Sequence, residues 1–508
     1  MKYKELILTF ASVLLLSLAR LPIHMGWLVF IAWIPVAHAL QTKGLKLKNI
    51  ILMAAIWGIT YTAIVFNWIA LVTVGGLLGI MLFYTVVFSI FFYFSHLIWQ
   101  KMPKIGWLGF ICLMISFEYL QQFGETRFPW WNMAYSLADY NLLLQILDIG
   151  GMSLIALLIM AINYLVDRLL QRKYLALGAI VLIFALWLGY GYYSYYSIKL
   201  ETKPLAVQVM QPCIPQSEKW DEGQFESMMA VFDSLSHEAA KEQTQLHIWP
   251  EAAIPAYLRY DARAMYKLRS TISETGLEIF TGFPDFEAAP ADHFDDAYYY
   301  NAASLYKPDG SPSSIYHKNI LVPVGERMLW IDIFPFMGKV NFGQANWEFG
   351  KELAYYESYG YRFSPSICYE LAFDRIHHHM ALPKDKDGGI RKMDFLVNLT
   401  NDAWFGTSYG PWLHMVMSRF RAIENRIQIY RSANTGISVI IDPMGRELRQ
   451  APLFEVTNLG APPYTCPRVP ILRYIYFYPA IFVVISVILA LISSFRSIFM
   501  KQSKEVIR

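Results

Sequence analysis

Long apolar segments constrain the fold of this 508-residue chain more than any other feature. A helix needs roughly 20 apolar residues to cross the hydrocarbon core of a bilayer. Eight segments approach or meet that length, at residues 5–20, 25–41, 49–71, 78–99, 105–122, 149–166, 174–196 and 472–495. With 55% hydrophobic and 16% charged residues, the chain is too apolar for a soluble enzyme of this size. We therefore predict an integral membrane protein with an α-helical bundle of eight transmembrane helices.

Basic residues are distributed unevenly between the predicted loops. The loops on the side of the two termini hold most of them, including Lys43 and Arg168, whereas the short loops on the other side hold only Arg20 and Arg127. Loops rich in lysine and arginine tend to remain in the cytoplasm. We therefore predict that both termini are cytoplasmic and that the large polar segment, residues 197–471, lies outside the cytoplasm.

The polar segment between the last two predicted spans alternates strands with helices. Strands are expected at 204–210, 246–250, 278–284, 302–307, 362–370, 395–400 and 437–442. Helices are expected at 222–241, 261–275 and 411–427. Such alternation is typical of one α/β domain built on layered sheets. We therefore divide the chain into a seven-helix bundle (1–196), an α/β domain (203–466) and a C-terminal helix with its tail (467–508).

Charge and cysteine content exclude some classes of protein. The formal net charge of +3 is nearly neutral and gives no sign of a nucleic-acid partner. Four cysteines are too few for a disulfide framework, although a bridge between Cys213 and Cys466 stays open. The adjacent residues 377–379 are histidines that point in different directions, so we predict a loop cluster there and no metal site. Nothing in the sequence requires a cofactor.

Three short motifs in the polar segment each end an apolar, β-rich run with one reactive side chain. They present Glu251 in WPEAAIP, Lys318 in YHKNILVPVGE and Cys368 in SPSICYE. Active-site residues of such domains often lie at strand ends and in the turns that follow. A carboxylate, an ammonium and a thiol suit acyl chemistry, because the other two groups help to form the nucleophilic thiolate. Trp404 and Phe405, in NDAWFG, can wall a pocket beside them.

Together these motifs resemble the catalytic set of the nitrilase, or carbon–nitrogen hydrolase, superfamily. The predicted membrane helices narrow the resemblance to the bacterial apolipoprotein N-acyltransferases, and it covers essentially the whole chain. It is also carried by the segments IPQSEKW, YNAA, NDAWFG, RAIENR, RSANTG, IDPMGR and FPWWNMAYS. Each motif is weak alone, but their order, spacing and membrane context are specific.

The resemblance implies a nitrilase-like αββα sandwich and a helix bundle, in the inner membrane of a bacterium, with the catalytic domain in the periplasm. It implies transfer of an acyl chain from a phospholipid, typically phosphatidylethanolamine, through a cysteine thioester. The acceptor would be the α-amine of the diacylglyceryl-cysteine of an apolipoprotein. By position, Glu251 would be the base, Lys318 the stabiliser of the oxyanion and Cys368 the nucleophile. Two further acidic positions and two substrate-side aromatics also match the family: Glu326, Glu370, Trp220 and Tyr369.

Several alternatives stay open at this point. Glu326 and Glu370 can each orient Lys318 or serve only as salt-bridge partners. A membrane-anchored amidase or nitrilase that uses water would share the three reactive residues, although it would need only one anchor. A degenerate homologue that acts as a scaffold is a third reading. Under the first reading we expect a phospholipid donor, a diacylglyceryl apolipoprotein acceptor and membrane lipids as partners of a monomer.

Overall fold

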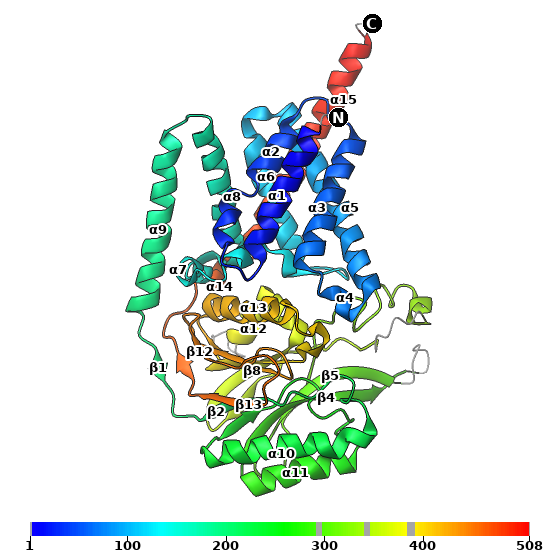
Figure 1. Ribbon diagram of the computed structural model, residues 1–508, viewed down its shortest axis with the longest axis vertical. Coiled ribbons are helices and arrows are strands. Elements are labelled where there is room, and N and C mark those ends of the chain that lie inside the picture. Colours follow the sequence, from blue (N-terminus) through cyan, green and yellow to red (C-terminus); the bar gives the residue numbers. More distant parts are fainter. Residues whose placement is uncertain (1–2, 291–296, 340–345, 384–391, 507–508) are drawn as a thin grey trace. The chain divides into compact units, whose positions relative to one another are not determined.

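The computed structural model describes residues 3–290, 297–339, 346–383 and 392–506, and side chains as far as residue 498. The chain divides into two compact units. Unit 1 comprises Met1–Phe123, Phe128–Tyr195 and Ile471–Arg508, and unit 2 comprises Gly124–Arg127 and Tyr196–Pro470. Unit 1 is helical and unit 2 is an α/β structure (Figure 1).

Unit 1 is the predicted α-helical bundle. Its helices are α1 (Lys4–Arg20), α2 (Ile34–Gln41), α3 (Leu47–Val65), α4 (Ile69–Val72), α5 (Val74–Lys101), α6 (Gly106–Leu120), α7 (Asn141–Leu144), α8 (Leu147–Leu170), α9 (Leu175–Ser197, which ends in unit 2), α14 (Leu472–Ile475) and α15 (Pro479–Val506). Short 3₁₀ segments join them: η1 (Gly26–Phe30), η2 (Pro103–Ile105), η3 (Pro129–Trp131) and η4 (Met133–Leu137).

Six helical segments among the described residues are long and apolar enough to cross a membrane. They are Leu47–Val65, Val74–Lys101, Pro103–Leu120, Leu147–Leu170, Leu175–Ser197 and Leu472–Ile498. The first two predicted spans correspond to α1, which has 17 residues, and to the shorter apolar segment Gly26–Gln41, which begins as a 3₁₀ helix. The count of eight therefore stays a prediction, whereas the bundle itself is confirmed.

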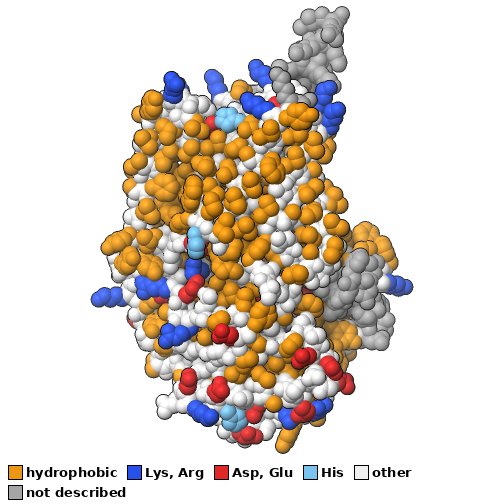
Figure 2. All heavy atoms as spheres, viewed as in Figure 1, with side chains coloured by type: hydrophobic (Ala, Val, Ile, Leu, Met, Phe, Trp, Pro, Cys, Tyr) orange, Lys and Arg blue, Asp and Glu red, His pale blue; other side chains and the backbone are white. Residues whose placement is uncertain are grey.

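The outer surface of unit 1 is apolar, as a surface that faces lipid must be. Hydrophobic side chains cover the face of the helices seen in Figure 2. On α5 the large exposed apolar residues recur every fourth position, at Leu78, Leu82, Val86 and Ile90, so they form one stripe along the helix. Burying these groups in lipid removes them from water and stabilises the inserted state.

Unit 2 contains two six-stranded sheets. The first has the order β13-β2-β3-β4-β5-β6, formed by β13 (Thr457–Ala461), β2 (Val207–Gln211), β3 (Leu246–Ile248), β4 (Glu278–Ala288), β5 (Ala297–Tyr306) and β6 (Tyr316–His317). The second has the order β12-β11-β10-β9-β8-β7, formed by β12 (Glu447–Gln450), β11 (Val439–Ile441), β10 (Gln428–Ala433), β9 (Phe395–Thr400), β8 (Tyr361–Ile367) and β7 (Tyr356–Ser358). A separate pair joins β1 (Glu201–Thr202) to β14 (Tyr464–Thr465).

Each sheet has a parallel centre and antiparallel edges. The parallel pairs are β2 with β3, β3 with β4, β8 with β9 and β9 with β10. Parallel strands are normally buried on both faces, and β9 and β10 are buried at every position. Neighbouring parallel strands have their carboxyl ends on the same side of the sheet. The residues that follow β3 therefore lie at the carboxyl ends of the parallel strands of the first sheet. Those that follow β8 and β9 lie together at the corresponding ends of the second sheet.

The two sheets pack face to face between two helical layers (Figure 1). Across the interface, the rings of Phe280 on β4 and Phe363 on β8 lie 5.2 Å apart, and Ser432 on β10 donates to the carbonyl of Met210 on β2 at 2.8 Å. The helices α10 (Phe225–Lys241) and α11 (Ala262–Thr275) cover the first sheet, with Phe232 packed against Trp249. The helices α12 (Asp374–Ala381) and α13 (Gly410–Asn425) cover the second. The predicted nitrilase-like αββα sandwich is therefore confirmed.

Most predicted elements of unit 2 appear with shifted ends. The strand at 395–400 matches β9, and the helices at 222–241 and 261–275 begin slightly later than predicted, at Phe225 and Ala262. The prediction was wrong for 377–379, because these histidines lie on α12 and not in a loop. On α12 (Asp374–Ala381), buried His377 and Met380 lie on the side of the helix that faces the second sheet. The sequence alone does not show which side of this short helix is buried.

Candidate active site

Glu251 lies in the turn that follows β3 and is 7% exposed. Its Oε1 accepts a hydrogen bond from Asn301 Nδ2 at 2.7 Å, and its Oε2 accepts one from the backbone N–H of Asn401 at 2.8 Å. A Cβ at Gly282 would lie 2.8 Å from the backbone nitrogen of Ala252, so only glycine lets β4 approach this turn. Burial raises the pKa of Glu251 against the opposing charge of Lys318, which makes this carboxylate a better proton acceptor.

Lys318 directly follows β6 and is fully buried. Its Nζ lies 2.7 Å from Glu326 Oε1 and 3.7 Å from Glu251 Oε1. Its backbone N–H donates to the carbonyl of Asn301, the residue that also holds Glu251. Although burial opposes it, the pKa of Lys318 is raised, because Glu326 and Glu251 together outweigh the loss of solvent. The side chain therefore stays an ammonium.

Cys368 directly follows β8 as the first residue of the short 3₁₀ turn η7 (Cys368–Ala372). Its φ of +48° is a left-handed conformation that non-glycine residues rarely adopt. Such strain is commonly stored at functional sites, where the surrounding structure maintains it. Burial and Glu251 raise the pKa of the thiol, whereas Lys318 lowers it, so the three groups interact electrostatically. The structure thus brings Glu251, Lys318 and Cys368 together.

Glu326 and Glu370 occupy different positions. Glu326 pairs with Lys318 through Oε1, and its Oε2 accepts from the backbone of Val322 at 2.8 Å. Glu370 accepts from backbone N–H groups of Asn319, Ile320 and Ile367, and from the hydroxyl of Tyr316 at 2.8 Å. Glu370 therefore fastens the segment after Lys318 to the turn of Cys368, and burial raises its pKa to about 7.

A buried ionic network contacts the backbone of Cys368, and its residues were not among those predicted from the sequence. His414 Nε2 lies 3.1 Å from the carbonyl oxygen of Cys368, and its Nδ1 lies 2.9 Å from Asp402 Oδ1. Arg431 donates to Asp402 Oδ2 at 2.6 Å and to Asn398 at 2.5 Å. Burial opposes ionisation of Asp402, but Arg431 and His414 outweigh it and lower the pKa of this carboxyl to about 2.

Lys219 is a second buried ammonium that the sequence analysis did not single out. It is 2% exposed, and its Nζ donates to the backbone carbonyl of Glu251 at 2.8 Å. Its only sequence signal is its place in IPQSEKW, one of the segments that carry the family resemblance, directly before Trp220. Burial lowers the pKa of Lys219 to about 8.

The predicted substrate-side aromatics differ in their exposure. Tyr369 is buried, and its hydroxyl donates to the backbone carbonyl of Arg127 at 2.6 Å. Trp220 and Trp404 are about half exposed, at 52% and 50%. Phe405 is partly buried, with its ring 6.3 Å from that of His414. Tyr369 is thus part of the framework next to Cys368, whereas the two tryptophans present apolar surface to the surroundings.

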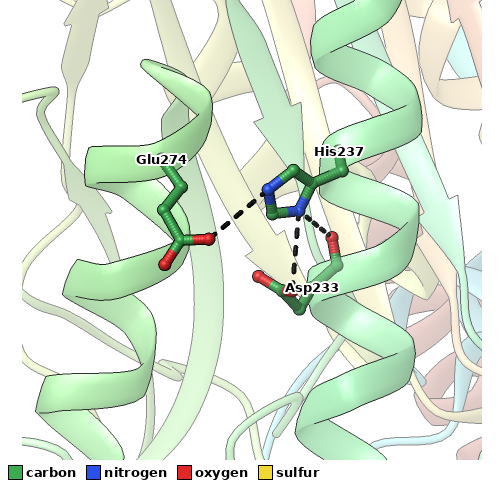
Figure 3. Close-up of side chains that lie close together, drawn as sticks. All are labelled: Asp233, His237 and Glu274. Carbon is green, nitrogen blue, oxygen red and sulfur yellow. Dashed lines mark hydrogen bonds and ion pairs between the residues drawn. The ribbon is translucent and has the colours of Figure 1, made fainter.

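Among the described residues, one group of potential metal ligands lies elsewhere in unit 2. Asp233 and His237 on α10 face Glu274 on α11 (Figure 3). Nδ1 of His237 lies 3.5 Å from Asp233, whereas Nε2 lies 3.5 Å from Glu274. A metal ion needs ligands that converge on one point, but this ring directs its two nitrogens to different carboxylates. The group is therefore arranged as a bridge between two helices.

The remaining cysteines are free thiols. Cys213 and Cys466, for which a bridge was open, are unpaired, and so is Cys112. Cys213 is partly buried, and burial raises the pKa of its thiol to about 11. Cys213 lies in the same unit and has neither Glu251 nor Lys318 among the groups that shift its pKa, so it provides a comparison for Cys368.

The comparisons with known proteins agree with this architecture. The family model for carbon–nitrogen hydrolases matches residues 206–460, and that for the N-terminal domain of apolipoprotein N-acyltransferases matches residues 12–165. An apolipoprotein N-acyltransferase from Chlorobaculum tepidum is 30% identical over 447 residues, which cover 81% of this chain and 80% of the relative. One from Geobacter metallireducens is 31% identical and covers 70% of this chain and 67% of the relative. One from Rickettsia prowazekii is 30% identical, with 71% and 70% covered. The resemblance seen in the motifs is thereby confirmed, and the chain belongs to the apolipoprotein N-acyltransferase family.

Proposed function

We propose that this protein transfers an acyl chain from a phospholipid to the α-amino group of the N-terminal diacylglyceryl-cysteine of apolipoproteins. The transfer would pass through a thioester on Cys368. The observation that carries the proposal is the meeting of Glu251, Lys318 and Cys368 in one site of a chain that belongs to this family. Lys318 Nζ lies 3.7 Å from the Glu251 carboxylate, and both groups interact with the thiol.

In the first half-reaction, Glu251 accepts the proton of the Cys368 thiol as sulfur attacks the ester carbonyl of the phospholipid. Burial raises the pKa of both groups, so before the attack the thiol is protonated and the Glu251 carboxylate is a stronger base than an exposed one. The ammonium of Lys318 faces the oxyanion, whose negative charge it stabilises. Losing one such donor typically costs about 3–4 kcal/mol of transition-state stabilisation. Glu251 returns the proton to the lysophospholipid oxygen, which leaves.

In the second half-reaction, the α-amine attacks the thioester carbonyl and Glu251 accepts a proton from the amine. The C–N bond forms, the C–S bond breaks, and the thiol regains its proton. Water competes with the amine at this stage, so a transferase must limit its access. The half-exposed tryptophans Trp220 and Trp404 offer apolar surface that can accommodate acyl chains.

The chain is a bacterial membrane protein, since the relatives named above are bacterial and six helices among its described residues are long and apolar enough to span a membrane. We propose the inner membrane as its location, with both termini in the cytoplasm and unit 2 in the periplasm. Exposed Lys43 and Lys46 between α2 and α3, together with Lys48 in the first turn of α3, support this orientation, because cytoplasmic loops and the adjoining helix ends are enriched in lysine. A phospholipid donor and a lipidated acceptor would both be held in that membrane, which suits an enzyme that is anchored there.

Mass spectrometry of the intact protein after incubation with phosphatidylethanolamine tests the acyl-enzyme. We expect an adduct with the mass of one acyl chain on the wild type and on Cys213→Ser, the matched control. The Cys368→Ser variant should carry no thioester adduct. An adduct that persists without Cys368, or none on the wild type with any phospholipid, would contradict the proposal. Release of ammonia from simple amides would instead favour the amidase reading.

A further inference from the structure

Lys219 lies on the connection between β2 and α10, immediately before the half-exposed Trp220. Lysine is seldom buried without a charged partner, because removing an ammonium from water is costly. This side chain is nevertheless 2% exposed, with its Nζ 2.8 Å from the carbonyl oxygen of Glu251. Its charge also interacts with Glu251 and Cys368. The ammonium is therefore held beside the base and the nucleophile.

The segment that carries Lys219 is fastened to the site by side chains of the site itself. Asn401 uses its backbone N–H to hold Glu251 Oε2 and its side-chain Nδ2 to hold Gln216 at 2.8 Å. Asn434 exchanges two hydrogen bonds with the backbone of Ile214, at 2.9 and 2.8 Å. One set of asparagines thus fixes Glu251 and the segment of Lys219 together, so the placement of the ammonium follows from the framework of the site.

Lys219 offsets negative charge in a site where the carboxyls Glu251, Glu326 and Glu370 outnumber the other ammonium, Lys318. With Cys368 as a thiol, Glu251 and Glu326 contribute two negative charges, and Lys318 contributes one positive charge. Lys219 supplies the second positive charge. When the thiol proton moves to Glu251, the thiolate replaces that carboxylate and the net charge of the site does not change. Without Lys219, the same transfer would create a thiolate in a site with excess negative charge, since Asp402 is already paired with Arg431.

We propose that Lys219 is a positioning residue that fixes the backbone of Glu251 and supplies the second positive charge that stabilises the Cys368 thiolate. Lys219 keeps its protons throughout, and the proton of the thiol goes to Glu251. The acyl substrate in this inference rests on the proposed function. The effect of Lys219 on the reactivity of the Cys368 thiol does not.

Two substitutions separate this role from a purely structural one. Lys219→Met keeps the unbranched side chain, one heavy atom shorter, and removes its charge, whereas Lys219→Arg keeps the charge. The matched control is Lys241→Met, which removes an exposed lysine at the end of α10. Each variant is compared with the wild type as the full chain in detergent, and its thermal unfolding is recorded.

The first readout is the rate at which iodoacetamide alkylates Cys368 at pH 7, followed by peptide mass spectrometry. We expect Lys219→Met to slow alkylation about 10- to 100-fold, less than the loss of a direct transition-state donor. Lys219→Arg and Lys241→Met should stay within about threefold of the wild type. Equal alkylation rates in the wild type and Lys219→Met would overturn the inference. Because this assay needs no phospholipid, it remains informative if the proposed acyl transfer fails.

The second readout is the pH dependence of acyl-enzyme formation from phosphatidylethanolamine. Because burial lowers the pKa of Lys219 to about 8, the wild type should lose this charge, and acylation rate, as the pH rises through 8. Lys219→Arg stays charged, so its decline should move to higher pH. If Lys219→Met does not fold, the comparison of the wild type with Lys219→Arg tests the electrostatic role without it. Identical alkaline limbs in the wild type and Lys219→Arg would refute the electrostatic role.

Discussion

The Asp402→Asn substitution should destabilise the protein by about 3 kcal/mol, because it breaks a fully buried ion pair. Arg431 NH2 lies 2.6 Å from Asp402 Oδ2, and both side chains are fully buried. The amide keeps the shape of the carboxylate but not its charge, so the guanidinium is left without a counter-ion in the interior. The amide has one acceptor oxygen in place of two, so the separate contacts with Arg431 and with His414, whose Nε2 lies 3.1 Å from the carbonyl oxygen of Cys368, cannot both be kept.

The magnitude can be reached independently from the acidity of Asp402. Its pKa is about 2 instead of the ordinary 3.8, which corresponds to about 2.5 kcal/mol of stability at neutral pH. A lowered carboxyl pKa contributes stability above the ordinary value, and that contribution disappears as the pH falls through the folded value. The difference between wild type and Asp402→Asn should therefore be constant from pH 7 to 5 and smaller at pH 3.

Thermal unfolding of the full chain in detergent measures the effect. A loss of 3 kcal/mol should lower the unfolding midpoint by about 6–12 °C for a structure of this size. Asp332→Asn is the control, because Asp332 is 65% exposed and its partner Arg327 keeps Glu348. That control should change stability by less than about 1 kcal/mol. An Asp402→Asn midpoint within 2 °C of the wild type would refute the reasoning.

Three further perturbations test the site. Glu326→Gln removes the carboxylate 2.7 Å from Lys318 Nζ, so acyl-enzyme formation should slow about 10- to 100-fold, and an unchanged rate counts against its role. The unfolding midpoint should fall by less than that of Asp402→Asn, because the buried ammonium of Lys318 keeps Glu251 at 3.7 Å. Gly282→Ala places a Cβ 2.8 Å from the backbone nitrogen of Ala252, so it should destabilise the protein by about 1–3 kcal/mol in the same unfolding assay. An unchanged midpoint would show that the turn of Glu251 can move aside to make room for the methyl group. Trp404→Ala with Phe405→Ala should raise thioester hydrolysis relative to transfer, measured as free fatty acid against acylated peptide; unchanged partitioning would exclude a shielding role.

The reactive residues were predictable because each follows a strand that the alternation of apolar and polar residues predicts. Cys368 directly follows β8, and Lys318 directly follows β6 within HKNILVPVGE. Glu251 comes three positions after the end of β3. A change from apolar alternation to a polar turn marks a strand end in the sequence, and parallel topology then gathers such ends. The layered fold followed from the same patterns.

The supporting residues were not predictable, because a polar side chain in a sequence predicts an exposed position even where the fold buries it. The strand β10 has the sequence QIYRSA, yet all of its positions are buried, and Arg431 points to Asp402 within the interior. Such groups find their hydrogen-bond partners only in the folded structure, so the pattern of apolar and polar residues does not predict their burial. The same holds for Lys219, whose burial depends on asparagines far along the chain. In unit 1, 25–41 was predicted as one span, but a 3₁₀ helix occupies Gly26–Phe30.

The central claim is that a fatty chain passes from Cys368 to an amine instead of water. A chase of purified, isotope-labelled acyl-enzyme with a diacylglyceryl-cysteinyl peptide tests it most directly. We predict that the label leaves the protein and appears on the α-amine of the peptide as an amide that resists hydroxylamine. An N-acetylated peptide should receive no label. Release of the label as free fatty acid, at the same rate with and without the peptide, would contradict the account.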